Sequence, residues 1–171
     1  RYSGAAEFTT DKPTDKRWLN TPSFGYQNAD MALGGPIFPG NRRTSFFTSG
    51  EWRNQDDSRP RWGVKADEFE RALLPEKSFD MLSNGLQPHN NLSGWTMQGK
   101  LSARVSDTVT LKTGFLRSEN DRDFYQHSYR YNLRHAPVAR DDNRSFHATL
   151  TWMLSSKTFL TLSANSFSTG Y

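Results

Sequence analysis

The chain has 171 residues, no cysteine and a formal net charge of +4. Only 34% of its residues are hydrophobic, whereas about 45–50% is usual in a soluble domain. The lack of cysteine excludes disulfide scaffolds and thiol nucleophiles, and no apolar run approaches the roughly 18 residues that a transmembrane helix needs. Aromatic residues nevertheless make up 13% of the chain, more than a disordered segment would carry.

Three strands are expected in the first third of the chain, near residues 2–10, 26–34 and 43–53. In each of them apolar or small residues alternate with polar ones, and a period of two places the two kinds on opposite faces of a strand. The stretch 34–41 is dense in glycine and proline. It is expected to form the turn between the second and third strands.

The second half of the chain predicts two antiparallel hairpins with the same alternation. The first joins strands near 96–105 and 108–118 through a short polar turn at residues 106–107. The second joins strands near 145–154 and 158–168 through residues 155–157. Short polar connections between alternating segments are typical of β-hairpins.

The connections between these seven strands alternate in length. Short ones are expected at residues 35–42, 106–107 and 155–157, and long, charged ones at residues 11–25, 54–95 and 119–144. Strands of about ten residues with alternate short turns and long loops are typical of a transmembrane β-barrel. A soluble β-sandwich would also alternate, but it would keep its connections shorter.

A barrel would explain the low hydrophobic content, because only every second strand residue would face lipid. Trp52, Trp95 and Trp152 fall near the ends of the expected strands, where interfacial aromatic girdles lie. The sequence therefore predicts an all-β fold, an antiparallel transmembrane β-barrel segment of about seven strands.

Two segments carry a family resemblance. Residues 28–37, NADMALGGPI, and residues 43–51, RTSFFTSGE, resemble the early barrel of TonB-dependent outer-membrane receptors. The resemblance is greatest to the Oar-like group with a carboxypeptidase-regulatory-type N-terminal extension. Residues 1–10 are similar to the first barrel strand after the plug in that group, so the resemblance covers about residues 1–53.

The resemblance implies a receptor in the outer membrane of Gram-negative bacteria that binds a scarce, bulky ligand and imports it with energy from the TonB complex. Barrels of this kind have 22 strands, which need roughly 220 residues at about ten per strand. We therefore expect the chain to be the N-terminal portion of a larger barrel, with the plug domain outside it. An alternative is a structural or adhesive outer-membrane barrel component whose loops bind a partner; a small passive porin is less favoured because seven strands is an odd number.

The resemblance also implies a set of partners. These are the remainder of the barrel and the plug, the TonB complex through a segment outside the chain, outer-membrane lipid and an unidentified ligand. A nucleic-acid partner is not expected, because the basic residues are spread among 18 acidic ones rather than gathered on one stripe. We expect no enzymatic activity and no cofactor, since the four histidines lack a catalytic spacing.

The expected loop at residues 119–144 is the candidate ligand site, because aromatic faces and guanidinium donors alternate along it. Such groups hold sugars, peptides or anionic chelates; alternatively, they extend the flanking strands and pack on one another. The candidate residues are Phe124, Tyr125, Tyr129, Arg130, Tyr131 and Arg134.

Two further sets of polar residues follow from the expected strands. One set would lie on the inner face of the barrel and line its lumen: Glu51, Arg53, Lys100, Arg104, Lys112 and His147. The other set is acidic, Asp121, Asp123, Asp141 and Asp142. Carboxylates of this kind can bind calcium, but neighbouring arginines could neutralise them equally well, and no metal site is expected.

Overall fold

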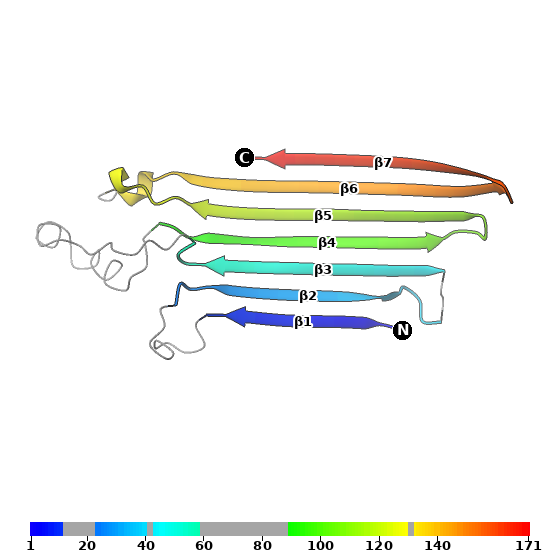
Figure 1. Ribbon diagram of the computed structural model, residues 1–171, viewed down its shortest axis with the longest axis horizontal. Coiled ribbons are helices and arrows are strands. Elements are labelled where there is room, and N and C mark those ends of the chain that lie inside the picture. The colour runs from blue at the N-terminus through cyan, green and yellow to red at the C-terminus, as the bar shows by residue number, and fades with distance from the viewer. Residues whose placement is uncertain (12–22, 41–42, 59–88, 130–131) are drawn as a thin grey trace, which may run out of the picture.

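The computed structural model describes residues 1–11, 23–40, 43–58, 89–129 and 132–171. Within these ranges the fold is all-β, and seven antiparallel strands form one open sheet in the order of the sequence (Figure 1). The strands are β1 (Ser3–Thr10), β2 (Gln27–Pro36), β3 (Thr44–Gln55), β4 (Leu92–Arg104), β5 (Val109–Asp123), β6 (Val138–Ser155) and β7 (Thr158–Gly170). Two short 3-10 helices, η2 (His127–Tyr129) and η3 (Leu133–His135), lie between β5 and β6.

All seven expected strands are present, but β4, β5 and β6 extend four or more residues beyond their predicted bounds at the end nearest the long loops. β4 begins at Leu92, β5 continues to Asp123 and β6 begins at Val138. The loop expected at residues 119–144 is therefore shorter than predicted, because residues at both ends of this segment belong to β5 and β6. The ladder continues through charged residues. Asp121 stands opposite Arg140, and the like-charged pair of Glu119 and Asp142 is neutralised by ion pairs with Arg140 and Arg144, because pairs of opposite charge stabilise a sheet.

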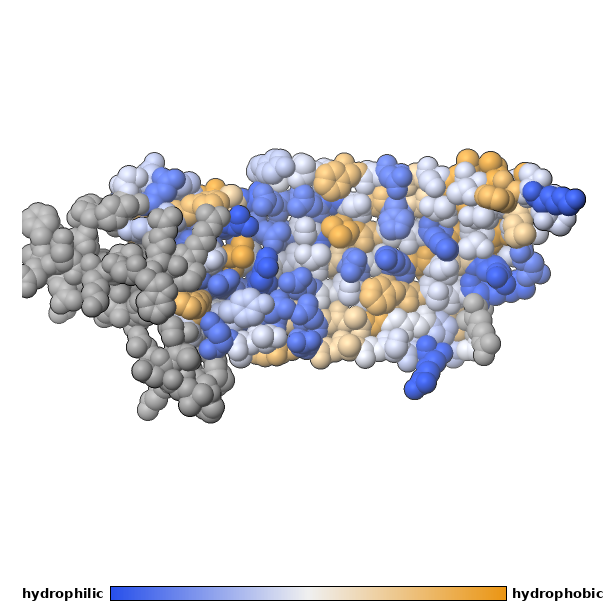
Figure 2. Space-filling model, in the orientation of Figure 1, coloured by the Kyte–Doolittle hydropathy of each residue, from blue (hydrophilic) through white to orange (hydrophobic). Residues whose placement is uncertain are grey.

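The register divides the strand residues between two faces, since directly opposite residues of an antiparallel pair lie on the same face. One face, which we call the polar face, is turned towards the viewer in Figure 2, where hydrophilic and neutral side chains dominate and orange ones are separate. The other carries most of the hydrophobic side chains. These form the apolar band, which consists of Ala6, Phe8, Ala29, Met31, Leu33, Phe46, Trp52, Trp95, Met97, Leu101, Ala103, Val109, Leu111, Phe115, Phe146, Ala148, Leu150, Trp152, Leu160, Leu162 and Ala164.

The apolar band runs obliquely across the sheet. Its limit on the side of the long loops lies at Phe8 on β1 and at Trp95 on β4, which belong to one row of directly opposite residues. On β5 and β6 the limit lies four residues further from those loops, at Phe115 and Phe146, and on β7 it lies six residues further, at Ala164. Six residues along a strand span about 20 Å and the six interstrand spacings from β1 to β7 span about 29 Å, which gives the limit a slope of about 35°.

The sheet is a single layer with little apolar burial. Among the described hydrophobic residues only Ala136 is buried, and large apolar side chains such as Met31 (66% exposed) and Leu162 (56% exposed) are open. Exposed apolar patches of this extent mark surfaces that contact a protein or a membrane. The described part of the chain therefore does not supply the second layer that a soluble sandwich would require.

In the same part of the chain, no helix has the length and apolar character needed to cross a membrane.

Gly94 on β4 is a position where the sheet requires glycine. A Cβ atom there would lie 2.8 Å from the Glu119 carbonyl oxygen and would also meet the Asn120 side chain. We expect Gly94→Ala to lower the free energy of unfolding by about 1–3 kcal/mol, because the neighbouring backbone must shift. Gly50→Ala on β3 is the control, since its nearest neighbour would be the Thr96 oxygen at 3.6 Å. Denaturant titrations would contradict the expectation if both variants lost the same stability.

Candidate functional site

All six residues predicted to line a lumen lie on the polar face. Glu51 and Arg53 are on β3, Lys100 and Arg104 on β4, Lys112 on β5 and His147 on β6, and the register places all of them on the side opposite the apolar band. Strand alternation was sufficient to group them, because a period of two fixes the face of each side chain.

The polar face carries an uneven distribution of charge. Glu7, Asp30 and Glu51 stand directly opposite one another on β1, β2 and β3, whereas the basic residues predicted for this face lie mainly on β4 and β5. Like charges directly opposite one another destabilise a sheet. The Asn28 side-chain amide donates a hydrogen bond to the Asp30 carboxylate. One of the three acidic residues therefore has a hydrogen-bond donor beside it.

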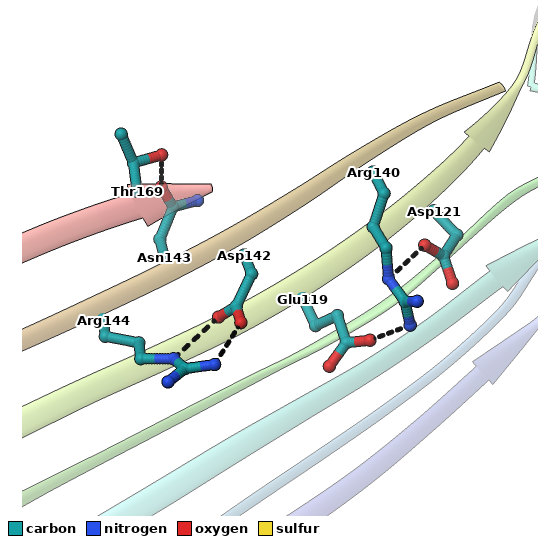
Figure 3. Close-up of polar contacts among 7 residues, drawn as sticks. All are labelled: Glu119, Asp121, Arg140, Asp142, Asn143, Arg144 and Thr169. Carbon is teal, nitrogen blue, oxygen red and sulfur yellow. Dashed lines mark hydrogen bonds and ion pairs between the residues drawn. The ribbon is translucent and has the colours of Figure 1, made fainter. Parts of the chain in front are cut away.

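Hydrogen bonds between neutral side chains connect neighbouring strands on the polar face. Gln98 Nε2 donates to Ser49 Oγ at 2.9 Å, and Thr169 Oγ1 donates to Asn143 Oδ1 at 2.7 Å (Figure 3). Asn143 in turn donates to Ser118 Oγ at 3.4 Å. These bonds join β3 to β4, and β5 to β7 through Asn143 on β6, without apolar packing.

The candidate ligand loop is reduced to residues 124–137, and its described residues are partly held by local hydrogen bonds. The Phe124 amide donates to the Pro137 carbonyl at 3.1 Å, and the Arg122 guanidinium lies 6.0 Å from the Phe124 ring centroid. Tyr129 is 37% exposed, and its carbonyl accepts a hydrogen bond of 2.8 Å from the Asn132 amide. The part of the loop next to the strands, at Phe124, is therefore half-buried, whereas the Tyr129 side chain further along the loop is exposed.

The remaining candidates of this loop fall into two groups. Tyr125 is half-buried beside Phe124, and Arg134 is exposed on η3. Arg130 and Tyr131 lie outside the described residues. The structure therefore places Phe124, Tyr125, Tyr129 and Arg134 on one short connection at the loop end of β5 and β6.

A network of ion pairs extends β5 and β6 beyond the apolar band (Figure 3). Arg140 binds Glu119 and, through Nε, Asp121 at 3.2 Å. Arg144 binds Asp142 at 2.5 Å, and this hydrogen bond lowers the pKa of the Asp142 carboxyl below its ordinary value. Arginine thus neutralises two of the four acids considered for calcium.

A buried polar contact at the loop end was not identified from the sequence. Asp57 is fully buried and Asn90 is 4% exposed, and Asn90 Nδ2 donates to Asp57 Oδ1 at 2.5 Å. The Ser58 amide donates to the Asn90 carbonyl at 2.9 Å, and the Asp57 amide donates to the Phe24 carbonyl at 3.1 Å. These four residues, which we call the loop clamp, bring together the end of β3, the start of β4 and the connection before β2.

A second carboxylate orders the same region. Asp11 accepts hydrogen bonds from Ser23 Oγ at 2.9 Å, from the Phe24 amide at 2.6 Å and from the Tyr26 amide at 2.9 Å. Because Phe24 also contacts Asp57, Asp11 links the ends of the first long connection to the loop clamp. No periodic pattern marks such residues, so alternation could not have found them.

In comparisons with known proteins, no family model matches the chain, and neither a curated protein nor a solved structure was found to match it.

Proposed function

We propose that the chain forms part of the membrane-spanning β-barrel of a TonB-dependent outer-membrane receptor, which binds a scarce, bulky ligand and imports it. The observation that carries the proposal is the two-faced sheet. Its apolar band is exposed while the opposite face is polar, as a barrel wall between lipid and a water-filled interior requires.

The oblique course of the band supports the same proposal. Strands of outer-membrane barrels tilt by about 35–45° from the barrel axis, so a level lipid boundary crosses them obliquely. The slope of about 35° estimated from the register agrees with that tilt. Trp52 and Trp95 lie directly opposite each other at the limit of the band, which is the level of an interfacial aromatic girdle.

The open sheet supports membership of a larger barrel. β1 and β7 each have only one strand neighbour among the described strands, and a membrane-embedded sheet edge must be paired. The remainder of the barrel would supply those strands. The polar face, with Glu51, Lys100 and Lys112, would then line the interior around the plug.

The loop end of the sheet would meet ligand first. Phe124, Tyr125, Tyr129 and Arg134 offer aromatic faces and a guanidinium group, which suit a sugar, a peptide or an anionic chelate. The loop clamp and the ion pairs of Arg140 would hold the strand ends below them. The ligand would therefore bind to side chains placed on a fixed base rather than on a free loop.

The barrel wall can be tested with cysteine substitutions, because the chain contains no cysteine of its own. In cells that carry the intact protein, Leu150→Cys on the apolar band should resist a water-soluble maleimide. Thr149→Cys, its neighbour on the polar face, should react with the reagent once the outer membrane is made permeable. Equal labelling at both positions in folded protein would contradict the proposed wall.

The receptor function requires a second readout in the same cells. Ferric chelates, cobalamin, oligosaccharides and short peptides would be supplied as labelled probes, with and without a functional TonB complex. The proposal expects one probe to accumulate only with TonB, and accumulation to fall in a Tyr125→Ala variant. Surface binding of a protein partner with no TonB-dependent uptake would instead support the adhesive alternative.

A further inference from the structure

The apolar band contains a hollow that extends across β1, β2, β3 and β4. It has a volume of about 820 Å³ and is lined almost entirely by apolar atoms. Gly50 lies at its floor, between Met31 on β2 and Met97 on β4 in one row of the register. Ala6 and Ala29 continue the small-residue floor towards β1, so the hollow arises because small side chains stand among large ones.

The end of the hollow nearest the long loops has a different chemistry. Trp52 and Trp95 line it there, and the guanidinium carbon of Arg117 lies 5.5 Å from the Trp95 ring centroid. Arg117 is exposed and stands directly opposite Met97, which also lines the hollow. A cation therefore lies beside the rim of an apolar depression.

The carboxylates that flank Arg117 in the register already have other partners. Glu119, two residues further along β5, is paired with Arg140. Asp142 on β6 is paired with Arg144. Arg144 stands directly opposite Arg117, and Asp142 interacts less strongly with Arg117 than with Arg144. The charge of Arg117 is thus less completely matched than those of its neighbours, and charge-assisted hydrogen bonds to a phosphate group would satisfy it.

We infer that this hollow, with Arg117 at its rim, is a binding site for one lipid of the surrounding membrane whose phosphate headgroup carries a net negative charge. The inference rests on the proposed function. An acyl chain lies over Gly50 between the two methionines, whose unbranched side chains adapt to an irregular chain. The lipid phosphate accepts hydrogen bonds from Arg117 at the level of the tryptophan pair, where headgroups are found.

The hollow has an apolar floor and a cation at one end. This combination favours a lipid over a second copy of the chain as the occupant. A second copy would bring its own apolar band, which offers no anion to Arg117. A lipid with an anionic phosphate matches both parts of the site. In a zwitterionic phospholipid of the same chain length the headgroup's own ammonium group already neutralises the phosphate, so this lipid matches the apolar part and binds Arg117 more weakly.

Quenching of tryptophan by brominated acyl chains tests the site. The intact protein would be reconstituted in phosphatidylcholine vesicles with a small fraction of brominated phosphatidylglycerol or brominated phosphatidylcholine. One variant keeps only Trp52 and Trp95, and another keeps only Trp152, with every other tryptophan replaced by phenylalanine. We expect Trp52 and Trp95 to report about a tenfold preference for the brominated anionic lipid, as one charge-assisted hydrogen bond allows, and Trp152 to report none.

Substitutions separate the two parts of the site. Arg117→Gln should abolish the preference, whereas Arg104→Gln on the polar face should preserve it. Gly50→Leu should fill the hollow and reduce quenching by both lipids at Trp52 and Trp95, because a Cβ atom at Gly50 has room, 3.6 Å from the Thr96 oxygen. Gly50→Ala should have little effect.

Three outcomes would overturn the inference. Equal quenching by both brominated lipids at Trp52 and Trp95 would show that the site does not select a lipid with a net negative charge. A dimer that dissociates on Gly50→Leu substitution would show that a second copy occupies the hollow. A lack of quenching at Trp152 by either lipid would mean that the sheet does not face lipid, and would overturn the proposed function together with the inference.

Discussion

Replacing Leu111 with arginine should destabilise the folded protein by about 2–4 kcal/mol if the sheet is the proposed barrel wall, because this is the cost of a basic residue on the lipid face at the middle of a bilayer. Leu111 lies within the apolar band of β5, directly opposite Ala103 on β4 and Leu150 on β6. A guanidinium group at this depth cannot reach water easily. The measurement is a denaturant titration of the intact protein in lipid vesicles, followed by tryptophan fluorescence.

Two comparisons make this result specific. Lys112→Arg is the adjacent position on the polar face and keeps its charge, so it should cost little. Val109→Arg lies at the short-turn end of the band on β5, where the cost near the interface should fall to about 0–1 kcal/mol. If all three variants had similar stability, neither the assignment of the faces nor the lipid boundary would stand.

Replacing Asp57 with alanine should lower the free energy of unfolding by about 1–3 kcal/mol, because the buried Asn90 amide would lose its acceptor. Asp57 is fully buried, and its backbone also joins the loop clamp through Phe24. The loss concerns a contact between residues 33 positions apart in the chain. It should therefore affect the geometry of the loop end as well as global stability.

Asp56→Ala provides the matched control, since Asp56 is adjacent and exposed. Its side chain accepts a hydrogen bond of 3.3 Å from Asn54 at the surface, which is worth little in water. Unfolding by denaturant, together with hydrogen exchange at the Ser58 amide, would measure both effects. An Asp57 variant as stable as the Asp56 variant, with unchanged exchange, would argue against the loop clamp.

β5 and β6 continue beyond the strands that the sequence predicted, to Asp123 and from Val138. The alternation of apolar and polar residues did not predict these charged parts of the two strands. Asp121 and Arg140 fall in the loop expected at residues 119–144, because the alternation of apolar and polar residues does not extend over them. In the structure they are strand residues, and Arg140 forms ion pairs with Asp121 opposite it and diagonally with Glu119. That pairing depends on the register of two distant segments. A single-strand pattern contains no information about the partner.

The sequence alone determined the seven strands of the described part of the chain, their order of appearance and the face of each side chain within the predicted strand bounds. It did so because the two-residue period of a strand is local and needs no partner. The grouping of Glu51, Arg53, Lys100, Arg104, Lys112 and His147 on one face followed directly from that period.

Only the tertiary structure decided how those strands align. The oblique course of the apolar band, the hollow over Gly50 beside Arg117 and the burial of Asp57 against Asn90 all depend on which residues of neighbouring strands stand opposite each other. Register is set by the summed cross-strand contacts of the whole sheet and by the turns that join it. These are long-range quantities, and a local pattern of apolar and polar residues does not fix them.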